Sequence, residues 1–208
     1  MTKQFKEQGG AATMDPSRLK RWLTSRVMTR LVDPARLARR RAEAEKARVR
    51  EQRPHRVEYF HQVEDGYSHL AAQLLPRLQE RYDIVLDCHL VAGPVGKNVP
   101  EPEMLLPLSR DDAFHIAPEY GLSFPRHPQA PNADLLEQAT GILAAQDTRA
   151  FTAVAADVGH ALWSEDSAAL ALLAAEHGAA SAAQAAQRIT AGNARRAALK
   201  HYSGAMFY

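Results

Sequence analysis

The chain has 208 residues, of which 46% are hydrophobic and 24% are charged. This composition fits one globular domain, or one domain with an arm, and excludes a wholly disordered or collagen-like chain. No apolar run approaches the ~18–20 residues that cross a bilayer, and the first residues lack the apolar centre of a signal peptide. We therefore expect a soluble, cytoplasmic protein. Its single cysteine, Cys88, excludes an internal disulfide and a CxxC redox pair.

The net charge of +2 hides a division along the chain. Residues 1–56 hold 16 basic and 6 acidic side chains, whereas the remaining 152 residues hold 10 basic and 18 acidic ones. We therefore expect a basic helical arm over residues 1–55 and an acidic body over residues 56–208. Such an arm can bind nucleic acid or an anionic membrane surface. We favour an arm that lies against its own acidic body or is simply solvated. No base-reading motif supports nucleic acid.

Two helices are predicted in the arm. The first begins near Asp15 or Ser17, runs for about 15 residues and carries apolar side chains at helical spacing: Leu19, Trp22, Leu23, Val27, Met28 and Leu31. A helix of this kind can lie at a membrane interface or pack its apolar stripe on the body. The second helix, over residues 35–53, is rich in Arg, Ala and Glu and should be mostly exposed.

In the body, the pattern predicts a strand over 57–62, a helix over 67–82 and a strand over 84–91. A strand, helix and strand of this length favour a parallel pair with a right-handed crossover. A long loop over 92–108 and a short helix over 109–120 follow. Ala-rich helices are then predicted over 132–145, 150–163, 167–177 and 181–200, which form an all-helical subdomain. Cys88 alternates with Leu86 and Leu90, so we expect an inert core thiol.

These segments, taken in order, resemble a known family. The strand RVEYFHQ, the helix EDGYSHLAAQLLPRL, the strand DIVLDCHLV and the later helix WSEDSAALALLAAEHG are similar to the DsbA-like branch of the thioredoxin superfamily. The nearest group contains 2-hydroxychromene-2-carboxylate isomerase and the kappa-class glutathione transferases. The resemblance runs from residue 56 to the end and implies an α/β, thioredoxin-like (DsbA-like) fold with a helical insertion over about 109–200.

The same resemblance implies where a site would lie. The letters DGYS fall on the family's SPYS, so Asp65 takes the position of the active-site serine or cysteine. Tyr67, Ser68 and His69 are then the other catalytic candidates, the first two as hydroxyls that steer a ligand sulfur and His69 as a general base. The structural alternative makes Asp65 a helix N-cap and places the hydroxyls in the first turn. An Asp carboxylate here would also repel a thiolate.

The resemblance further places Lys97 and Asn98 in a glutathione-binding loop and Ala205 at the position of the family's cis-proline. It implies a glutathione-dependent isomerase or transferase, in which bound glutathione supplies the thiol that adds to a small electrophilic molecule. Because Asp65 and Ala205 depart from the family pattern, a catalytically inactive thioredoxin-like binding protein or fragment stays open as an alternative.

Two further expectations concern metals and partners. Three histidines, His61, His69 and His89, lack the spacing of a metal motif, so no metal site is expected. The letters HYSGAMFY resemble the start of the family's closing strands, and Tyr208 comes before a fourth strand. The sheet would then be completed by further residues of a longer protein, by a partner chain or by self-association at its open edge.

Overall fold

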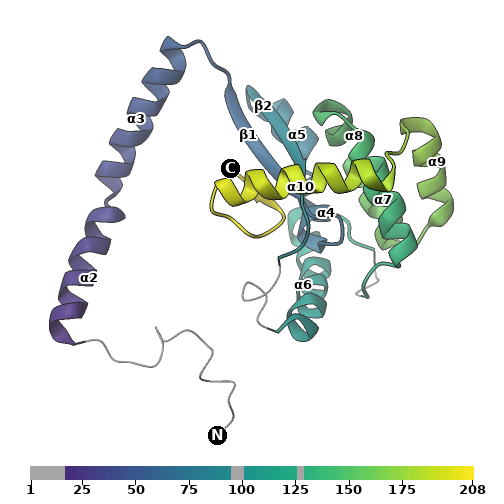
Figure 1. Cartoon of the computed structure of the whole chain (residues 1–208), viewed down its shortest axis with the longest axis horizontal. Helices are drawn as coiled ribbons and strands as arrows, with labels where there is room; N and C mark the ends of the chain where they lie inside the picture. The colour runs from purple at the N-terminus through teal and green to yellow at the C-terminus, as the bar shows by residue number, and fades with distance from the viewer. Residues whose placement is uncertain (1–16, 95–100, 126–128) are drawn as a thin grey trace, which may run out of the picture. The chain divides into compact units, whose positions relative to one another are not determined.

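The computed structural model describes residues 17–94, 101–125 and 129–208 (Figure 1). The chain divides into two compact units, Met1–Arg53 and Pro54–Tyr208. Among the described residues, no helix combines the length and the apolar character needed to cross a membrane.

The arm contains the two helices that the sequence predicts, α2 (Arg18–Leu31) and α3 (Pro34–Arg50). Ser17 begins α2 by accepting a hydrogen bond from the backbone N–H of Lys20, and Asp33 begins α3 in the same way through Ala35. Side-chain oxygens at these positions satisfy N–H groups that a helix start otherwise leaves unpaired. No residue of either helix is buried, so the expected exposure of the second helix is confirmed.

The body is built on a three-stranded sheet in the order β2-β1-β3. Strands β1 (His55–His61) and β2 (Ile84–Leu90) run parallel, with Tyr59 opposite Cys88. The short strand β3 (Met206–Phe207) pairs antiparallel with the other side of β1. The parallel pair predicted from the sequence is therefore confirmed.

The single helix predicted over 67–82 is wrong. The structure has two short helices instead, α4 (Gly66–Ala72) and α5 (Leu75–Arg81). Pro76 explains the break, because it has no N–H to donate to the carbonyl of Ala72 and its ring would collide with that carbonyl. The same proline is well placed in the first turn of α5.

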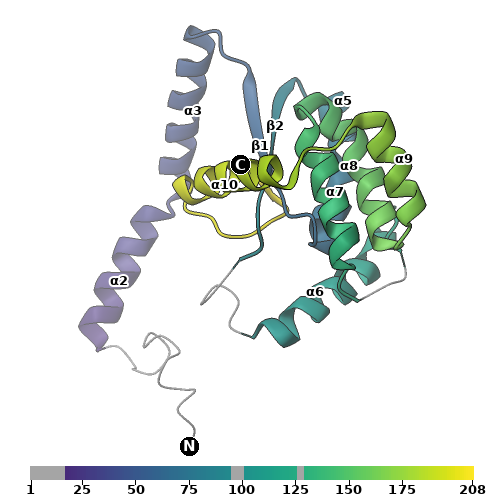
Figure 2. The same cartoon turned by 45° about the vertical axis from the view of Figure 1, so that its right-hand side comes forward.

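The helical subdomain forms largely as predicted. It consists of α6 (Pro102–Ile116), the 3₁₀ turn η2 (Ala117–Tyr120), α7 (Ala133–Ala145), α8 (Thr148–Trp163), α9 (Ser167–His177) and α10 (Ala182–Ala198). Figure 2 shows α7, α8 and α9 grouped together. The start of α6 corrects the prediction of a loop up to residue 108. Pro102 is tolerated in the first turn, and the helix continues through Pro107 at the loss of one hydrogen bond.

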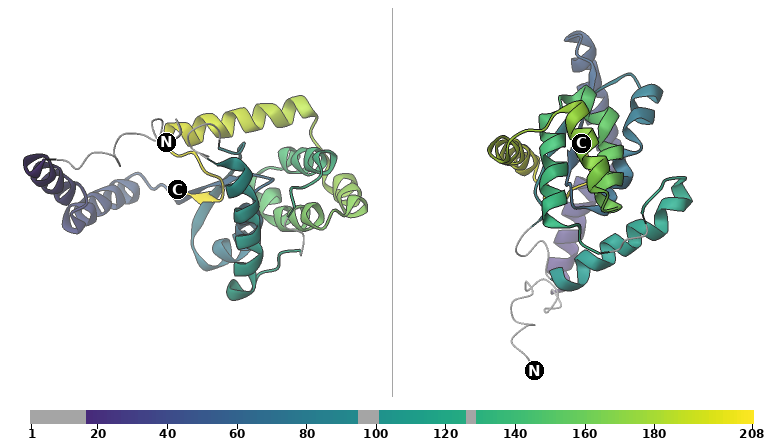
Figure 3. Two further views of the ribbon diagram at one scale, coloured as in Figure 1. Left: turned by 90° about the horizontal axis from the view of Figure 1, so that it is seen from below. Right: turned by 90° about the vertical axis from the view of Figure 1, so that its right-hand side faces the viewer.

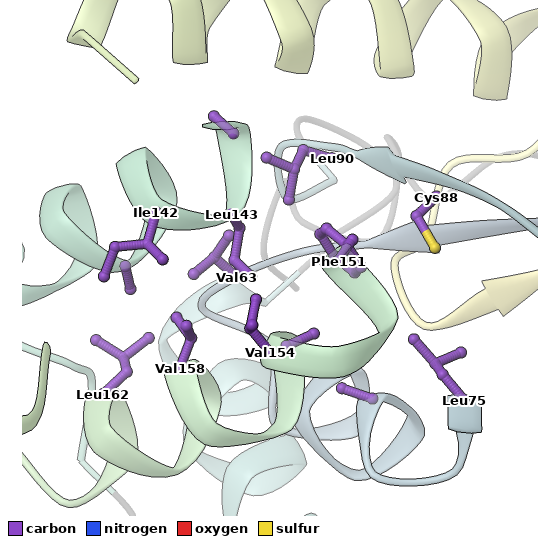
Figure 4. Close-up of a cluster of buried hydrophobic side chains, with 14 of the residues drawn as sticks. Val63, Leu75, Cys88, Leu90, Ile142, Leu143, Phe151, Val154, Val158 and Leu162 are labelled. Atoms are coloured by element: carbon purple, nitrogen blue, oxygen red, sulfur yellow. The ribbon is translucent and has the colours of Figure 1, made fainter. Parts of the chain in front are cut away.

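The core lies between one face of the sheet and helices α5 and α8, as Figure 4 shows. Cys88 and Leu90 of β2 meet Leu75, Phe151 and their neighbours there. Helix α10 covers the opposite face of the sheet (Figure 3). It approaches closely at Gly192, where an added Cβ would lie 2.0 Å from the carbonyl oxygen of Leu90.

Charged groups join α10 to this second face of the sheet. The buried carboxylate of Glu58 accepts hydrogen bonds from Arg195 Nε at 2.7 Å and from His89 Nε2 at 3.0 Å. Arginine and histidine both interact favourably with the ionised carboxyl, and Arg195 is the main reason why the pKa of Glu58 is lowered. This cluster links β1, β2 and α10, and we assign it a structural role.

Candidate functional site

The hydroxyl of Ser68 is the centre of a buried network at the start of α4. It donates to the carboxylate of Asp65 at 2.8 Å and accepts from the backbone N–H groups of Gln62 at 3.2 Å and Ala205 at 3.1 Å. Ser68 has no solvent exposure. A hydroxyl has one donor and two acceptor positions, so all of its hydrogen-bonding capacity is used within the chain.

Asp65 is the N-cap of α4, as the structural alternative predicted. The same oxygen that binds the Ser68 hydroxyl also accepts from the Ser68 backbone N–H at 2.8 Å. Burial raises the pKa of Asp65, although the hydrogen bonds from Ser68 favour its charged form and act in the opposite direction. The carboxylate therefore occupies the backbone N–H groups at the start of α4.

Tyr67 and His69 point to other parts of the structure. The hydroxyl of Tyr67 donates to Asp112 of α6 at 2.6 Å, and burial together with Asp112 raises the pKa of Tyr67 to about 12. The side chain of His69 is buried between α4 and α8. Gly159 of α8 leaves room for the imidazole ring, because a Cβ at position 159 would lie only 2.4 Å from Nδ1 of His69. Burial lowers the pKa of His69 to about 4, so its imidazole is neutral near pH 7.

Of the three predicted ligand-binding residues, the structure describes Ala205 alone. Ala205 lies against the Ser68 network, with a left-handed backbone at φ +51°. Its neighbour Gly204 packs closely on Gln62, since a Cβ at position 204 would lie 2.7 Å from the Cβ of Gln62. Lys97 and Asn98 lie outside the described residues. The structure thus brings Asp65, Ser68 and Ala205 together.

A cavity of about 610 Å³ opens beside this network, at the carboxyl ends of β1 and β2. In α/β proteins this edge of a parallel sheet is where ligands commonly bind. Its walls come from four segments and are mainly apolar: Gln62, Glu64, Asp65, Ala92, Gly93, Pro94, Pro102, Leu106, Ser109, Arg110, Ala130, Pro131 and Leu136. The volume suits one small organic molecule.

Few polar groups face this cavity, and burial shifts the pKa values of three of them, Glu64, Asp65 and Arg110. Burial is the main cause that raises the pKa of Glu64, and the neighbouring charge of Asp65 adds to it. Glu64 accepts a hydrogen bond from Nε2 of Gln62 at 3.1 Å. Burial also lowers the pKa of Arg110, which enters the cavity from α6. Titratable groups shifted in a cleft are typical of binding or catalytic sites.

Sequence reasoning missed Gln62, Glu64 and Arg110 as site residues. One signal was available, because Gln62 and Glu64 directly follow the predicted strand, where side chains reach the carboxyl edge of a parallel sheet. Arg110 gave no comparable signal, because only the packing of α6 against α4 brings it to this edge.

The remaining candidates are structural. Cys88 is buried in the core, and burial raises the pKa of its thiol to about 12, in agreement with the inert thiol predicted. His61 is buried as well, with Nδ1 at 2.9 Å from the Tyr59 hydroxyl, and burial lowers its pKa to about 3. Across residues 17–94, 101–125 and 129–208, no group of His, Cys, Asp or Glu is arranged to hold a metal ion.

No family model matches the sequence, and the curated proteins contain no match. Two solved structures are similar to the chain. One is a 2-hydroxychromene-2-carboxylate isomerase, with 19% identity and a TM-score of 0.49 over 74% of this chain and 84% of that one. The other is a candidate protein disulfide isomerase from Nitrosomonas europaea, with 15% identity and a TM-score of 0.49 over 74% and 87% of the two chains.

The order of the elements decides the fold class. A parallel strand, helix and strand is followed by a helical insertion, and β3 then returns antiparallel beside β1 with its preceding loop against the start of α4. The fold is α/β, a small three-stranded sheet with a helical insertion. One fold can host several chemistries, so function has to be argued from the residues of the cavity and of the Ser68 network.

Proposed function

We propose that this chain is a thioredoxin-fold binding protein that takes one small, mainly apolar ligand in the cavity beside Asp65 and performs no thiol chemistry of its own. The observation that carries the proposal is the saturated hydroxyl of Ser68, which is bonded to Asp65, Gln62 and Ala205. Thiol activation in this fold needs free backbone N–H groups at the start of the first helix. Here the carboxylate of Asp65 already accepts from that helix start.

The chain's own thiol gives no alternative route. Cys88 is buried on the core face of β2, and its raised pKa keeps it protonated at neutral pH. A protonated, inaccessible thiol is neither a nucleophile nor a redox partner.

The cavity supports binding of a compact apolar molecule with one polar group. Leu106, Pro131 and Leu136 supply apolar surface, whose burial drives binding. The carboxyl of Glu64 lines the cavity, where it accepts from Nε2 of Gln62 and from backbone N–H groups of Glu64 and Gly93. A hydroxyl or amide N–H of the ligand would donate to Glu64 at low cost, because the apolar remainder of the ligand excludes water from the bond.

The glutathione-dependent isomerase implied by the family resemblance is a second candidate with less support. Bound glutathione would bring a thiolate and two carboxylates to a region that already holds the carboxyls of Glu64 and Asp65. Among the described residues that line the cavity, Arg110 is the cation that would have to offset this charge. A mainly neutral ligand avoids that cost.

Binding can be tested with the uncharged aromatic probe N-phenyl-1-naphthylamine on the full chain. Leu106→Trp places extra volume in the cavity, and Leu172→Trp makes the same change on the exposed surface of α9, where Leu172 is 71% exposed. We expect Leu106→Trp to weaken probe binding at least about tenfold, the equivalent of 1.4 kcal/mol, and Leu172→Trp to leave it unchanged. Equal binding by the parent and both variants, measured by fluorescence titration, would contradict the proposal.

A further inference from the structure

We propose that helix α2 binds the surface of an anionic lipid bilayer. Its lipid-binding face consists of Leu19, Trp22, Leu23, Val27 and Leu31, and its cations are Arg18, Lys20, Arg21, Arg26 and Arg30. This proposal concerns the arm alone and is independent of the cavity.

The apolar side chains of α2 are exposed to a degree that a helix in water does not favour. Leu19 is 74% exposed, Leu31 is 64% exposed and Trp22 is 56% exposed. Leu19, Leu23, Val27 and Leu31 recur every fourth residue, so they follow one another along one side of the helix. Such a stripe requires an apolar partner.

The charge of the arm identifies the kind of partner. Helix α2 has five basic residues and no acidic one, and the sequence of α3 adds seven basic residues against two acidic ones. Each Lys or Arg close to an anionic leaflet strengthens binding roughly fivefold. Long arginine stems also lie along apolar surface while their guanidinium groups reach the headgroups.

Trp22 fits the same interface. The guanidinium carbon of Arg26 lies 5.3 Å from the centroid of its ring, in a cation–π contact. Tryptophan prefers the boundary between headgroups and acyl chains, because its ring is apolar and its indole N–H is polar. Trp22 and Arg26 would therefore contact adjacent layers of the bilayer surface.

A bilayer accounts for both features of α2, whereas nucleic acid accounts for one. Nucleic acid would neutralise the arginines but leave Leu19, Leu23 and Leu31 in water. The acidic body would also satisfy the positive charge. A lipid interface pairs the cations with phosphates and covers the apolar stripe at the same time.

The test uses the full chain and two kinds of vesicle, one of phosphatidylcholine alone and one with a quarter of phosphatidylglycerol. The chain has two tryptophans, of which Trp163 is only 2% exposed in the body. We therefore expect anionic vesicles to shift the emission of Trp22 to shorter wavelength and to pull the protein down on sedimentation. Trp22→Phe should abolish the emission shift.

Matched variants separate the contributions of positive charge and of apolar surface to vesicle binding. We expect Arg18→Gln with Arg30→Gln to weaken binding to the anionic vesicles by about 25-fold, whereas Arg77→Gln with Arg81→Gln, on the exposed side of α5, leaves it unchanged. Leu23→Gln should weaken it as well, and Leu172→Gln should not.

Three outcomes would overturn the proposal. The first is no binding to anionic vesicles at low ionic strength. The second is tighter binding to double-stranded DNA than to vesicles, with Leu23→Gln having no effect on the DNA complex, which would assign the arm to nucleic acid. The third is a lowered melting temperature of the body in the Leu23→Gln variant without vesicles, which would show that α2 packs on its own domain.

Discussion

The hydroxyl oxygen of Ser68 lies 3.1 Å from the backbone nitrogen of Ala205, a residue 137 positions later in the chain. This contact joins the start of α4 to the loop that leads into β3. Here the serine and the backbone bind each other, and the meeting point serves stability.

Ser68→Ala should therefore destabilise the body. The substitution leaves the N–H groups of Gln62 and Ala205 without their acceptor in a buried place, and each such group costs about 1–3 kcal/mol. We expect the free energy of unfolding to fall by about 2–4 kcal/mol in a urea titration. Ser203→Ala, at an exposed serine whose hydroxyl bonds only its neighbour Gly204, should change it by less than about 0.5 kcal/mol. Equal effects of the two variants would show that the network carries no stability.

Ala205→Pro tests whether the backbone before β3 can accommodate a proline. Proline fixes φ near −65°, whereas Ala205 has φ +51°, and proline has no N–H to give Ser68. We expect a loss of about 3 kcal/mol or more in unfolding free energy. Ala205→Gly is the control, because glycine accepts this φ and keeps the N–H, so stability should change by less than about 1 kcal/mol. A proline variant as stable as the parent would show that the loop can adopt another backbone.

Much of the fold could be predicted from local patterns, because most of its helices begin at a capping residue followed by a helical pattern of apolar residues. Asp33, Asp147, Asp166 and Ser181 each precede an apolar or Ala-rich run and each cap a helix in the structure. Proline was harder to interpret, since one side chain can break a helix, begin a helix or lie inside one. Pro76 begins α5, whereas Pro107 lies within α6. Only the packing of the surrounding helices decides which of these roles a proline takes.

The site could be predicted only in part, because its residues meet through tertiary contacts. The N-cap role of Asp65 follows from its place before a helix, and the structure confirms it. The burial of His69 depends on Gly159 of α8, and the cavity depends on Arg110 of α6. No spacing in the sequence links these residues to the turn after β1. A histidine beside a predicted active site therefore looked available when it is in fact packed in the core.

His69 should make stability depend on pH. Its folded pKa is lowered to about 4 from an ordinary 6.5, so between these values the unfolded chain binds a proton that the folded chain does not. Stability then falls as the pH falls through this window, by up to about 1.4 kcal/mol per pH unit, and is unaffected above it. Glu64 and Asp65 have raised pKa values and act in the opposite sense, lowering stability as the pH rises above their ordinary range.

Comparison with His69→Gln isolates the imidazole, because the carboxyls remain in both proteins. Between pH 6.5 and pH 5 we expect the parent to lose about 2 kcal/mol more than this variant in urea titrations. His115→Gln, at an exposed histidine of α6, should follow the parent. Parallel curves for the parent and His69→Gln would mean that His69 is protonated with little penalty in the folded state.

Asp65 gives the sharpest test of glutathione binding. If the tripeptide placed its thiolate at the start of α4, that thiolate would share the position with the Asp65 carboxylate, which accepts from the Ser68 N–H at 2.8 Å. Two charges ~4 Å apart at an effective dielectric constant near 20 repel by about 4 kcal/mol, or roughly three orders of magnitude in affinity. We expect the parent to give no heat with millimolar glutathione in calorimetry. Asp65→Ser and Asp65→Asn both keep a cap, because either side chain can accept from the helix N–H groups, and both remove the charge. Gain of binding in both variants would locate the thiol site at Asp65 and identify charge as the obstacle, whereas tight binding by the parent would show that the carboxylate does not occupy that site.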